Sequence, residues 1–105
     1  MGITKSDLFT KEQNDIALLA KTIGHPARVA ILQRLLNEES CVNSSLVSEL
    51  GLAQPTISQH LKELKRMELI QGSIDGNKLC YCINQETWAQ AKDVFEAFFK
   101  PTPKT

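Results

Sequence analysis

Residues 46–67 read LVSELGLAQPTISQHLKELKRM, and this stretch decides the fold. Its first five residues predict a short apolar helix, which Gly51 ends, and a second helix begins near Gln54 after a tight turn. Three apolar residues of the second helix recur at helical spacing: Ile57, Leu61 and Leu64. Two helices joined in this way form a helix-turn-helix, which presents its second helix to the major groove of DNA.

The outward face of the second helix is polar and weakly basic. At about 100 degrees per residue, Leu61 and Leu64 lie within about 40 degrees of Ile57, and most polar side chains point away from them. Glutamine pairs with adenine, serine and threonine suit a base edge or a phosphate, and lysine suits phosphates. We therefore expect this face to contact DNA, with the histidine on its flank. The expected contacts are Gln54, Thr56, Ser58, Gln59, His60, Lys62 and Arg66. An ordinary solvated helix face is the alternative.

The periodicity changes from helical to extended directly after this helix. Residues 69–74 and 78–83 are β-prone runs with an Asp-Gly pair between them. That pair is a strong hairpin signal because glycine adopts a positive φ without steric cost. The hairpin would hold Asn77 and Lys78 at its tip beside the same groove, so we expect both to contact DNA. A helix-turn-helix followed by such a hairpin is a winged helix-turn-helix.

Capping signals predict three more helices around this unit. Thr10 opens the first with a capping box, and Gly24 ends it. Another helix begins at Pro26 after His25, and Asn84 caps the last helix of the chain. We expect the buried face of the helix that begins at Pro26 to carry Val29, Leu32, Leu35 and Leu36.

The predicted element order is α-α-α-α-β-β-α, a mainly α fold with a small β-hairpin wing. A chain of 105 residues is long enough for one compact domain with a core of its own. We expect a single winged helix-turn-helix domain over residues 1–105, ordered over about 8–100 and loose at 101–105, where two prolines disfavour helix.

Charge and composition exclude several classes of protein. Twelve Lys and Arg balance twelve Asp and Glu, so the chain is not a globally basic nucleic-acid binder, although a local basic patch is compatible with this balance. No apolar run approaches the roughly 18 residues of a membrane span, and the N-terminus lacks the apolar region of a signal peptide. We therefore expect a cytoplasmic protein with no membrane partner, and three cysteines that are reduced thiols.

Three stretches of the sequence together resemble the ArsR/SmtB family of bacterial winged-helix repressors. They are HPARVAILQRLL at 25–36, LVSELGLAQPTISQHLKELKRMELI at 46–70, and DGNKLCYCIN at 75–84. The resemblance covers roughly residues 10–99 and is most specific over 46–70. It implies a homodimer with the first and last helices at the interface. It also implies binding to an imperfect palindrome in double-stranded DNA near a promoter, and release from that DNA on a chemical signal.

The last predicted helix independently favours a dimer. Its apolar stripe holds more aromatic surface than a small terminal helix needs for packing within one chain, and exposed patches of that size usually bind a partner. Together with the first helix, we expect it to form the interface through Ile16, Leu19, Ile23, Trp88, Phe95, Phe98 and Phe99.

The metal sites of the resembled family are vacant in this sequence. Many members bind metal through a Cys-Val-Cys-Asp box, whose two cysteine positions fall on Val42 and Ser44 here. A second family site uses His and acidic ligands from the last helix, but residues 84–100 contain no His, and Asp93 and Glu96 suit solvated charges. We therefore expect no metal at the family positions and no other cofactor.

The three cysteines are the remaining candidates for a sensor. Cys80 and Cys82 are two apart on a predicted strand, so their side chains share one face. If residues 39–42 form a third strand, Cys41 could lie beside the second strand of the hairpin. Three thiols within reach of one another would suit a soft metal, arsenite or an oxidative switch. The alternative is that they are small buried side chains without a chemical role.

The residue inventory does not support an enzyme. The chain has no glycine-rich phosphate loop, no His-Glu-x-x-His motif, and no Ser or Cys with a general base expected nearby. The serious alternative to a DNA-binding regulator is a protein-interaction module that keeps the winged-helix fold but binds a partner protein. The zero net charge supports this alternative, as does Ala53 at the cap of the DNA-facing helix, where the family usually has Ser.

Overall fold

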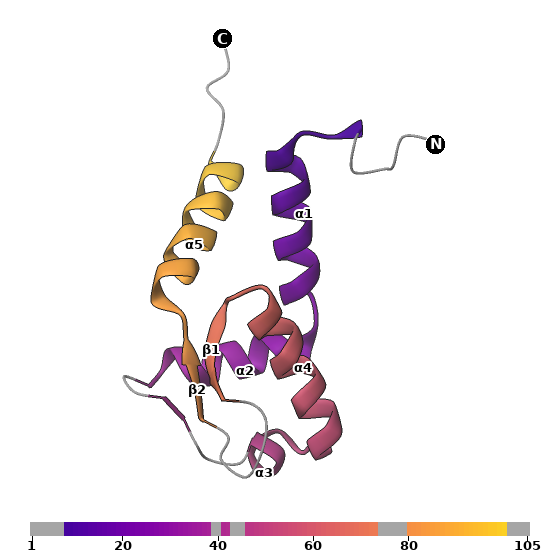
Figure 1. The fold of residues 1–105 in the computed structure, drawn as a ribbon, viewed down its shortest axis with the longest axis vertical. Coiled ribbons are helices and arrows are strands. Elements are labelled where there is room, and N and C mark those ends of the chain that lie inside the picture. The colour runs from indigo at the N-terminus through magenta and orange to yellow at the C-terminus, as the bar shows by residue number, and fades with distance from the viewer. Residues whose placement is uncertain (1–7, 39–40, 43–45, 74–79, 101–105) are drawn as a thin grey trace.

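The computed structural model describes residues 8–38, 41–42, 46–73 and 80–100 (Figure 1). The elements follow the predicted order: α1 (Lys11–Ile23), α2 (Pro26–Leu36), α3 (Leu46–Leu50), α4 (Gln54–Arg66), β1 (Ile70–Ser73), β2 (Cys80–Ile83) and α5 (Gln85–Phe99). The chain therefore folds as a winged helix-turn-helix, and the fold class predicted from the sequence is confirmed.

The helices begin and end where the capping signals predict. The Thr10 hydroxyl accepts the Gln13 N–H at 3.0 Å, and the Gln13 side chain accepts the Thr10 N–H at 2.9 Å, which completes the capping box of α1. His25 and Asn84 accept backbone N–H groups two and three residues further on, at the starts of α2 and α5. Gly51 has a φ of 72°, so it makes the turn between α3 and α4 without the strain a side chain would cause there.

The wing is an antiparallel pair with a short third segment at its edge. The register of β1 and β2 runs from Ile70 opposite Ile83 to Ser73 opposite Cys80. On the other side of β2, Val42 and Tyr81 exchange backbone hydrogen bonds of 2.7 and 3.1 Å, which form an isolated bridge. The third strand that the sequence allowed is thus a single bridged residue among the residues that the structure describes.

The core lies between α2, α4 and the inner face of the wing. Its residues are Ile31, Leu32, Leu35, Val42, Leu46, Ile57, Leu61, Leu64, Leu69, Ile70, Tyr81, Ile83 and Ala91. The expected buried face of α2 is confirmed for Leu32 and Leu35. It is wrong for Val29 and Leu36, which are 39% and 45% exposed, and Ile31 is fully buried instead. Because α2 is apolar on most of its circumference, its contacts with α3, α4 and β2 decide which apolar residues are covered.

Helices α1 and α5 lie side by side and extend together from one side of the body (Figure 1). Leu19, Ile23 and Trp88 pack against the edge of the core near the base of this pair. None of the helices in the described part of the chain is both long and apolar enough to cross a membrane.

Candidate nucleic-acid interface

Helix α4 is held against the body by the apolar stripe that the sequence predicts. Ile57, Leu61 and Leu64 are at most 2% exposed. Helix α3 is positioned from the other side by Arg34 of α2, whose Nε donates to Glu49 Oε2 at 3.0 Å. The helix-turn-helix is therefore packed into the core through one side of α4, and the other side of this helix is exposed.

Most of the predicted DNA contacts on α4 lie outside its buried apolar stripe. Thr56, Gln59 and Lys62 are exposed, and Gln54 and Ser58 lie one turn apart, joined by a hydrogen bond of 3.1 Å from Gln54 Nε2 to Ser58 Oγ. Amide, hydroxyl and ammonium groups are the side chains that read base edges and bind phosphates. These five residues are exposed or half-buried on α4, and we call them together the α4 face.

The basic residues at the end of α4 are engaged within the chain. Arg66 is exposed, but it donates to Glu63 Oε2 from Nη2 at 2.9 Å, and this pairing lowers the pKa of the Glu63 carboxyl below its ordinary value. The Lys65 ammonium donates to the carbonyl of Gly72 at 2.6 Å and so ties α4 to β1. Arg66 is also the predicted contact on α4 that lies farthest from the start of the helix, where recognition helices place their base contacts.

The structure corrects the expectation that His60 contacts DNA. Its side chain is only 8% exposed, its Nδ1 accepts a hydrogen bond of 3.0 Å from Arg28 Nε, and its ring centroid lies 4.4 Å from that of His25. The helical wheel contains the signal for this placement, because position 60 is only about 60 degrees from Ile57. His60 therefore belongs to the buried side of α4 and packs it onto the junction of α1 and α2.

The tip of the wing lies outside the residues that the structure describes. The two predicted contacts there, Asn77 and Lys78, thus remain predictions. The described parts of β1 and β2 lead directly into this tip from the end of α4.

A model of bacterial regulatory proteins, the arsR family, matches residues 25–71, from the start of α2 into β1. The arsenical resistance operon repressor of Staphylococcus xylosus is 33% identical to this chain over 72 residues, which are 69% of this chain and 68% of that protein. The chain belongs to the arsR family. The resemblance drawn from the sequence is confirmed, and members of this family are regulatory proteins.

Two other proteins are similar to this chain in sequence or in structure. The transcriptional regulator Rv0081 of Mycobacterium tuberculosis is 38% identical over 63 residues, and the chain spans 55% of that relative's length in this match. Its crystal structure superposes with a TM-score of 0.61 and 30% identity, covering 86% of this chain and 94% of that one. HlyU from Vibrio cholerae superposes with a TM-score of 0.62 and 27% identity, covering 87% of this chain and 98% of that one.

Exposed apolar side chains gather on α1 and α5 of this arsR-family chain. Among the predicted interface residues, Phe98 and Phe99 are exposed and Ile16 and Phe95 are half-buried, whereas Leu19, Ile23 and Trp88 are partly covered by the core. The sequence reading missed three exposed apolar residues near these helices: Leu8, Phe9 and Leu18. Phe98 and Phe99 pack edge to face, with centroids 5.1 Å apart, which leaves them a joint apolar surface at the end of α5.

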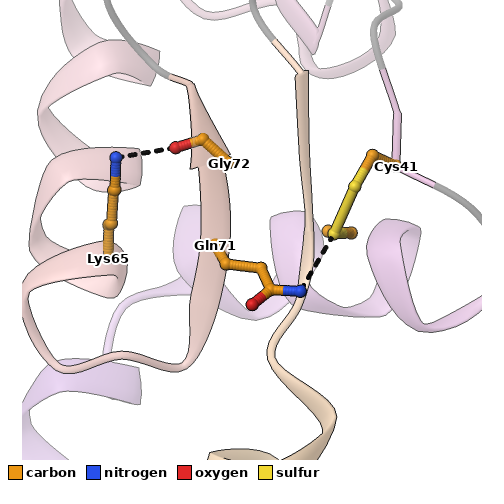
Figure 2. The surroundings of a disulfide bond; sticks show 5 residues. Cys41, Lys65, Gln71 and Gly72 are labelled. Atoms are coloured by element: carbon orange, nitrogen blue, oxygen red, sulfur yellow. Dashed lines mark hydrogen bonds between the residues drawn. A yellow bond between two sulfur atoms is a disulfide. The ribbon is translucent and has the colours of Figure 1, made fainter.

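The expectation of three reduced cysteines is wrong for two of them. Cys41 and Cys82 are joined by a disulfide, whereas Cys80 is a free thiol (Figure 2). The reason is the bridge between Val42 and Tyr81, which brings the two Cα atoms to 4.4 Å. In the described part of this arsR-family chain, His, Cys, Asp and Glu side chains form no group of three or more that could hold a metal ion.

Proposed function

We propose that this chain is a sequence-selective transcriptional repressor that binds double-stranded DNA as a homodimer. The observation that carries the proposal is the α4 face, a surface of amide, hydroxyl and ammonium groups on a helix whose other side is anchored in the core. Such a helix enters a major groove without deforming the body of the protein. Membership of the arsR family and the repressor named among its relatives support the same function.

In the proposed complex, Gln59 reads a base and Lys62 binds a phosphate. Glutamine makes two hydrogen bonds with adenine, whereas an ammonium group acts as a point charge on the backbone. Asn77 and Lys78 at the wing contact the flanking backbone. The first turn of α4 adds a further phosphate contact, because Ala53 supplies no side-chain cap and leaves N–H groups at the helix start able to bind an anion.

The dimer places two α4 helices on an imperfect palindrome. Two recognition helices related by a two-fold axis read half-sites about 34–36 Å apart, one turn of DNA. The exposed apolar surface of α1 and α5 supports dimer formation, because uncovered patches of this kind usually bind a partner. The protein acts in the cytoplasm, where the DNA that it binds lies. It is a regulator rather than an enzyme, and a chemical signal releases it from that DNA.

The test is DNA binding by fluorescence anisotropy on a duplex selected from a random library. The affinity of the wild-type chain should fall steeply with salt concentration, because each neutralised phosphate releases counterions. Gln59→Ala should cost about 1–3 kcal/mol on the selected site and little on random DNA. Lys62→Ala should weaken both alike and lower the salt slope by about one.

Matched controls for these variants lie away from the α4 face. Gln33→Ala on α2 and Lys11→Ala on α1 remove the same side-chain types at exposed positions, and both should leave DNA binding unchanged. Equal losses on selected and random DNA for Gln59→Ala would contradict its role in base reading. Absence of any salt-dependent DNA binding would overturn the proposal and favour the protein-interaction module, in keeping with the zero net charge.

A further inference from the structure

The backbone of the wing sets Cys41 and Cys82 opposite each other. Val42 and Tyr81 exchange two hydrogen bonds, so the neighbouring pair in this antiparallel register is a non-hydrogen-bonded pair, whose Cα atoms lie about 4.5 Å apart. The observed separation between Cys41 and Cys82 is 4.4 Å, within the range that a disulfide spans. The bridge sets this register through backbone hydrogen bonds, which do not depend on the disulfide.

Solvent reaches this pair from the outer face of the wing. Tyr81 and Ile83 point inward and are buried, whereas Cys82 between them is half-buried and Cys41 is exposed. Gln71 of β1 lies opposite Cys82, and its amide Nε2 donates to Cys82 Sγ at 3.8 Å (Figure 2). The pair is therefore open to a small oxidant or reductant, unlike a disulfide inside the core.

The disulfide encloses the whole proposed DNA-binding unit. Cys41 and Cys82 are 41 positions apart, and α3, α4, β1 and the tip of the wing lie between them in the chain. With the disulfide closed, the wing is held on both sides: β2 is joined to residue 41, and β1 is tied to α4 through Lys65 and Gly72 (Figure 2). A wing held on both sides has less freedom to adjust its position relative to α4.

We propose that Cys41 and Cys82 are a reversible redox pair, and that its closure by a hydroperoxide lowers the affinity of the protein for DNA. The consequence for DNA rests on the proposed function above, whereas the redox chemistry of the pair does not. A wing that contacts the DNA backbone beside the recognition helix must adjust to the shape of the groove. The open pair permits this adjustment, and the closed pair opposes it.

The reaction balances with the hydroperoxide as the two-electron oxidant. The exposed Cys41 thiolate attacks the terminal peroxide oxygen, an S–O bond forms, the O–O bond breaks, and the alkoxide leaves and takes a proton to become an alcohol. The Cys82 sulfur then attacks the sulfenic acid, the S–S bond forms, and hydroxide leaves with the Cys82 proton as water. Two thiols are oxidised to one disulfide, and the hydroperoxide is reduced to alcohol and water. A dithiol reductant reverses the change by thiol–disulfide exchange.

Cys80 supplies a matched control on the same strand. It is half-buried, it is a free thiol, and its side chain shares the outer face with Cys82 two residues away. If oxidation acted on any thiol of the wing, Cys80 would respond as well. The proposal assigns the response to the opposed pair alone, so Cys80→Ser should behave as wild type.

The experiment treats the full chain with a reductant or with cumene hydroperoxide and measures affinity for the selected duplex. Reduced wild type should bind, oxidised wild type should bind about tenfold more weakly, a coupling of ordinary size, and dithiothreitol should restore binding. The Cys41→Ser and Cys82→Ser variants should bind the duplex with the affinity of reduced wild type, and the oxidant should not change that affinity. Either variant alone suffices if the other does not fold. Mass spectrometry of alkylated, digested protein should find residues 41 and 82 linked after oxidation.

The outcomes separate the two proposals. If reduced wild type does not bind DNA, the proposed function fails, and mapping of the linked peptides still decides whether the redox pair exists. If reduced wild type binds and oxidation leaves its affinity unchanged or raises it, the inference is overturned while the proposed function stands. Loss of the response in Cys80→Ser, or release of the reduced protein by arsenite or cadmium but not by peroxide, would also overturn it.

Discussion

At the scale of single residues, His60 shows how the packing of α4 controls a proton. Its Nδ1 accepts from Arg28 Nε, so that nitrogen carries no proton in the folded chain. Burial, and then the charges of His25 and Arg28, lower the pKa of His60 below its ordinary value of 6.5. A proton on Nδ1 would remove this hydrogen bond and face a guanidinium, so the folded chain binds it less readily than the unfolded chain.

The stability of the protein should therefore depend on pH through His60. When the pH falls below about 6.5, the unfolded chain takes up the proton first, so the free energy of unfolding decreases until the lower pKa of the folded state is passed. Above that window His60 is neutral in both states and contributes no slope. His60→Gln should flatten the pH dependence in this window, as measured by urea unfolding at several pH values. The same slope in wild type and variant would contradict this account.

At the same scale, two glycines provide a matched pair. Gly72 has a φ of 126°, and a Cβ there would lie 2.0 Å from the carbonyl oxygen of Cys80, a backbone atom of the paired strand. Gly51 has a φ of 72°, but a Cβ there would meet nothing within 4 Å. The first position is therefore crowded and strained, whereas the second is only strained.

Replacement of these glycines by alanine should have unequal costs. Gly51→Ala should lower the free energy of unfolding by about 1–2 kcal/mol, the cost of a left-handed backbone with a side chain. Gly72→Ala should cost clearly more, because relief of the clash separates β1 from β2. Urea unfolding of both variants gives the comparison. Similar costs would show that the two strands can separate locally at little expense.

At the scale of elements, α1 and α5 leave apolar surface that the rest of the chain does not cover. Phe99 at the end of α5 is 73% exposed and Phe98 is 59% exposed. Phe95 stacks on Phe99 with centroids 6.3 Å apart, so the three aromatic rings form one continuous patch. Two such patches would cover each other in a two-fold dimer.

A charge in this patch should separate the proposed dimer. Phe98→Glu should give a monomer, because the carboxylate would be buried without a partner at the interface. Ala89→Glu is the control: it adds the same carboxylate at an exposed position, which nine residues at about 100 degrees each place on the opposite side of α5. Light scattering after size exclusion gives the mass of each variant. An unchanged dimer mass for Phe98→Glu would exclude the end of α5 from the interface.

At the scale of the whole molecule, the disulfide joins parts of the chain that are 41 positions apart. A cross-link over such a loop reduces the freedom of the unfolded chain, and its contribution is typically about 2–4 kcal/mol. The backbone hydrogen bonds between Val42 and Tyr81 do not depend on the disulfide, so we expect the core on the inner face of the wing to pack in the same way when the pair is open. Reduction should thus change stability more than it changes the fold.

Reduction of the wild-type chain should lower its melting temperature by about 8 °C or more, as expected for a loss of about 2 kcal/mol or more in a domain of this size. Cys41→Ser should melt at the temperature of the reduced protein and should not respond to reductant. Far-ultraviolet circular dichroism before melting checks that both forms keep the same helices. An equal melting temperature for oxidised and reduced wild type would contradict a stabilising cross-link.

The sequence by itself determined the features that depend on neighbouring residues. The capping box at Thr10, the turn at Gly51 and the apolar stripe of α4 were all predictable, because hydrogen bonds and sterics within one or two turns decide them. The strands on either side of the Asp-Gly pair follow from the same local chemistry. These signals suffice for the element order, and with it for the winged helix-turn-helix and the polar α4 face.

Only the tertiary structure decided which of several equivalent surfaces are covered. Helix α2 is apolar on most sides, so its contacts with three other elements select Ile31 over Val29. His60 is buried because the junction of α1 and α2 lies over it, a contact between residues 32 positions apart. Cys41 meets Cys82 because a single bridge sets the register between distant segments. Local sequence carries no record of such contacts, since they depend on how complete elements pack against one another.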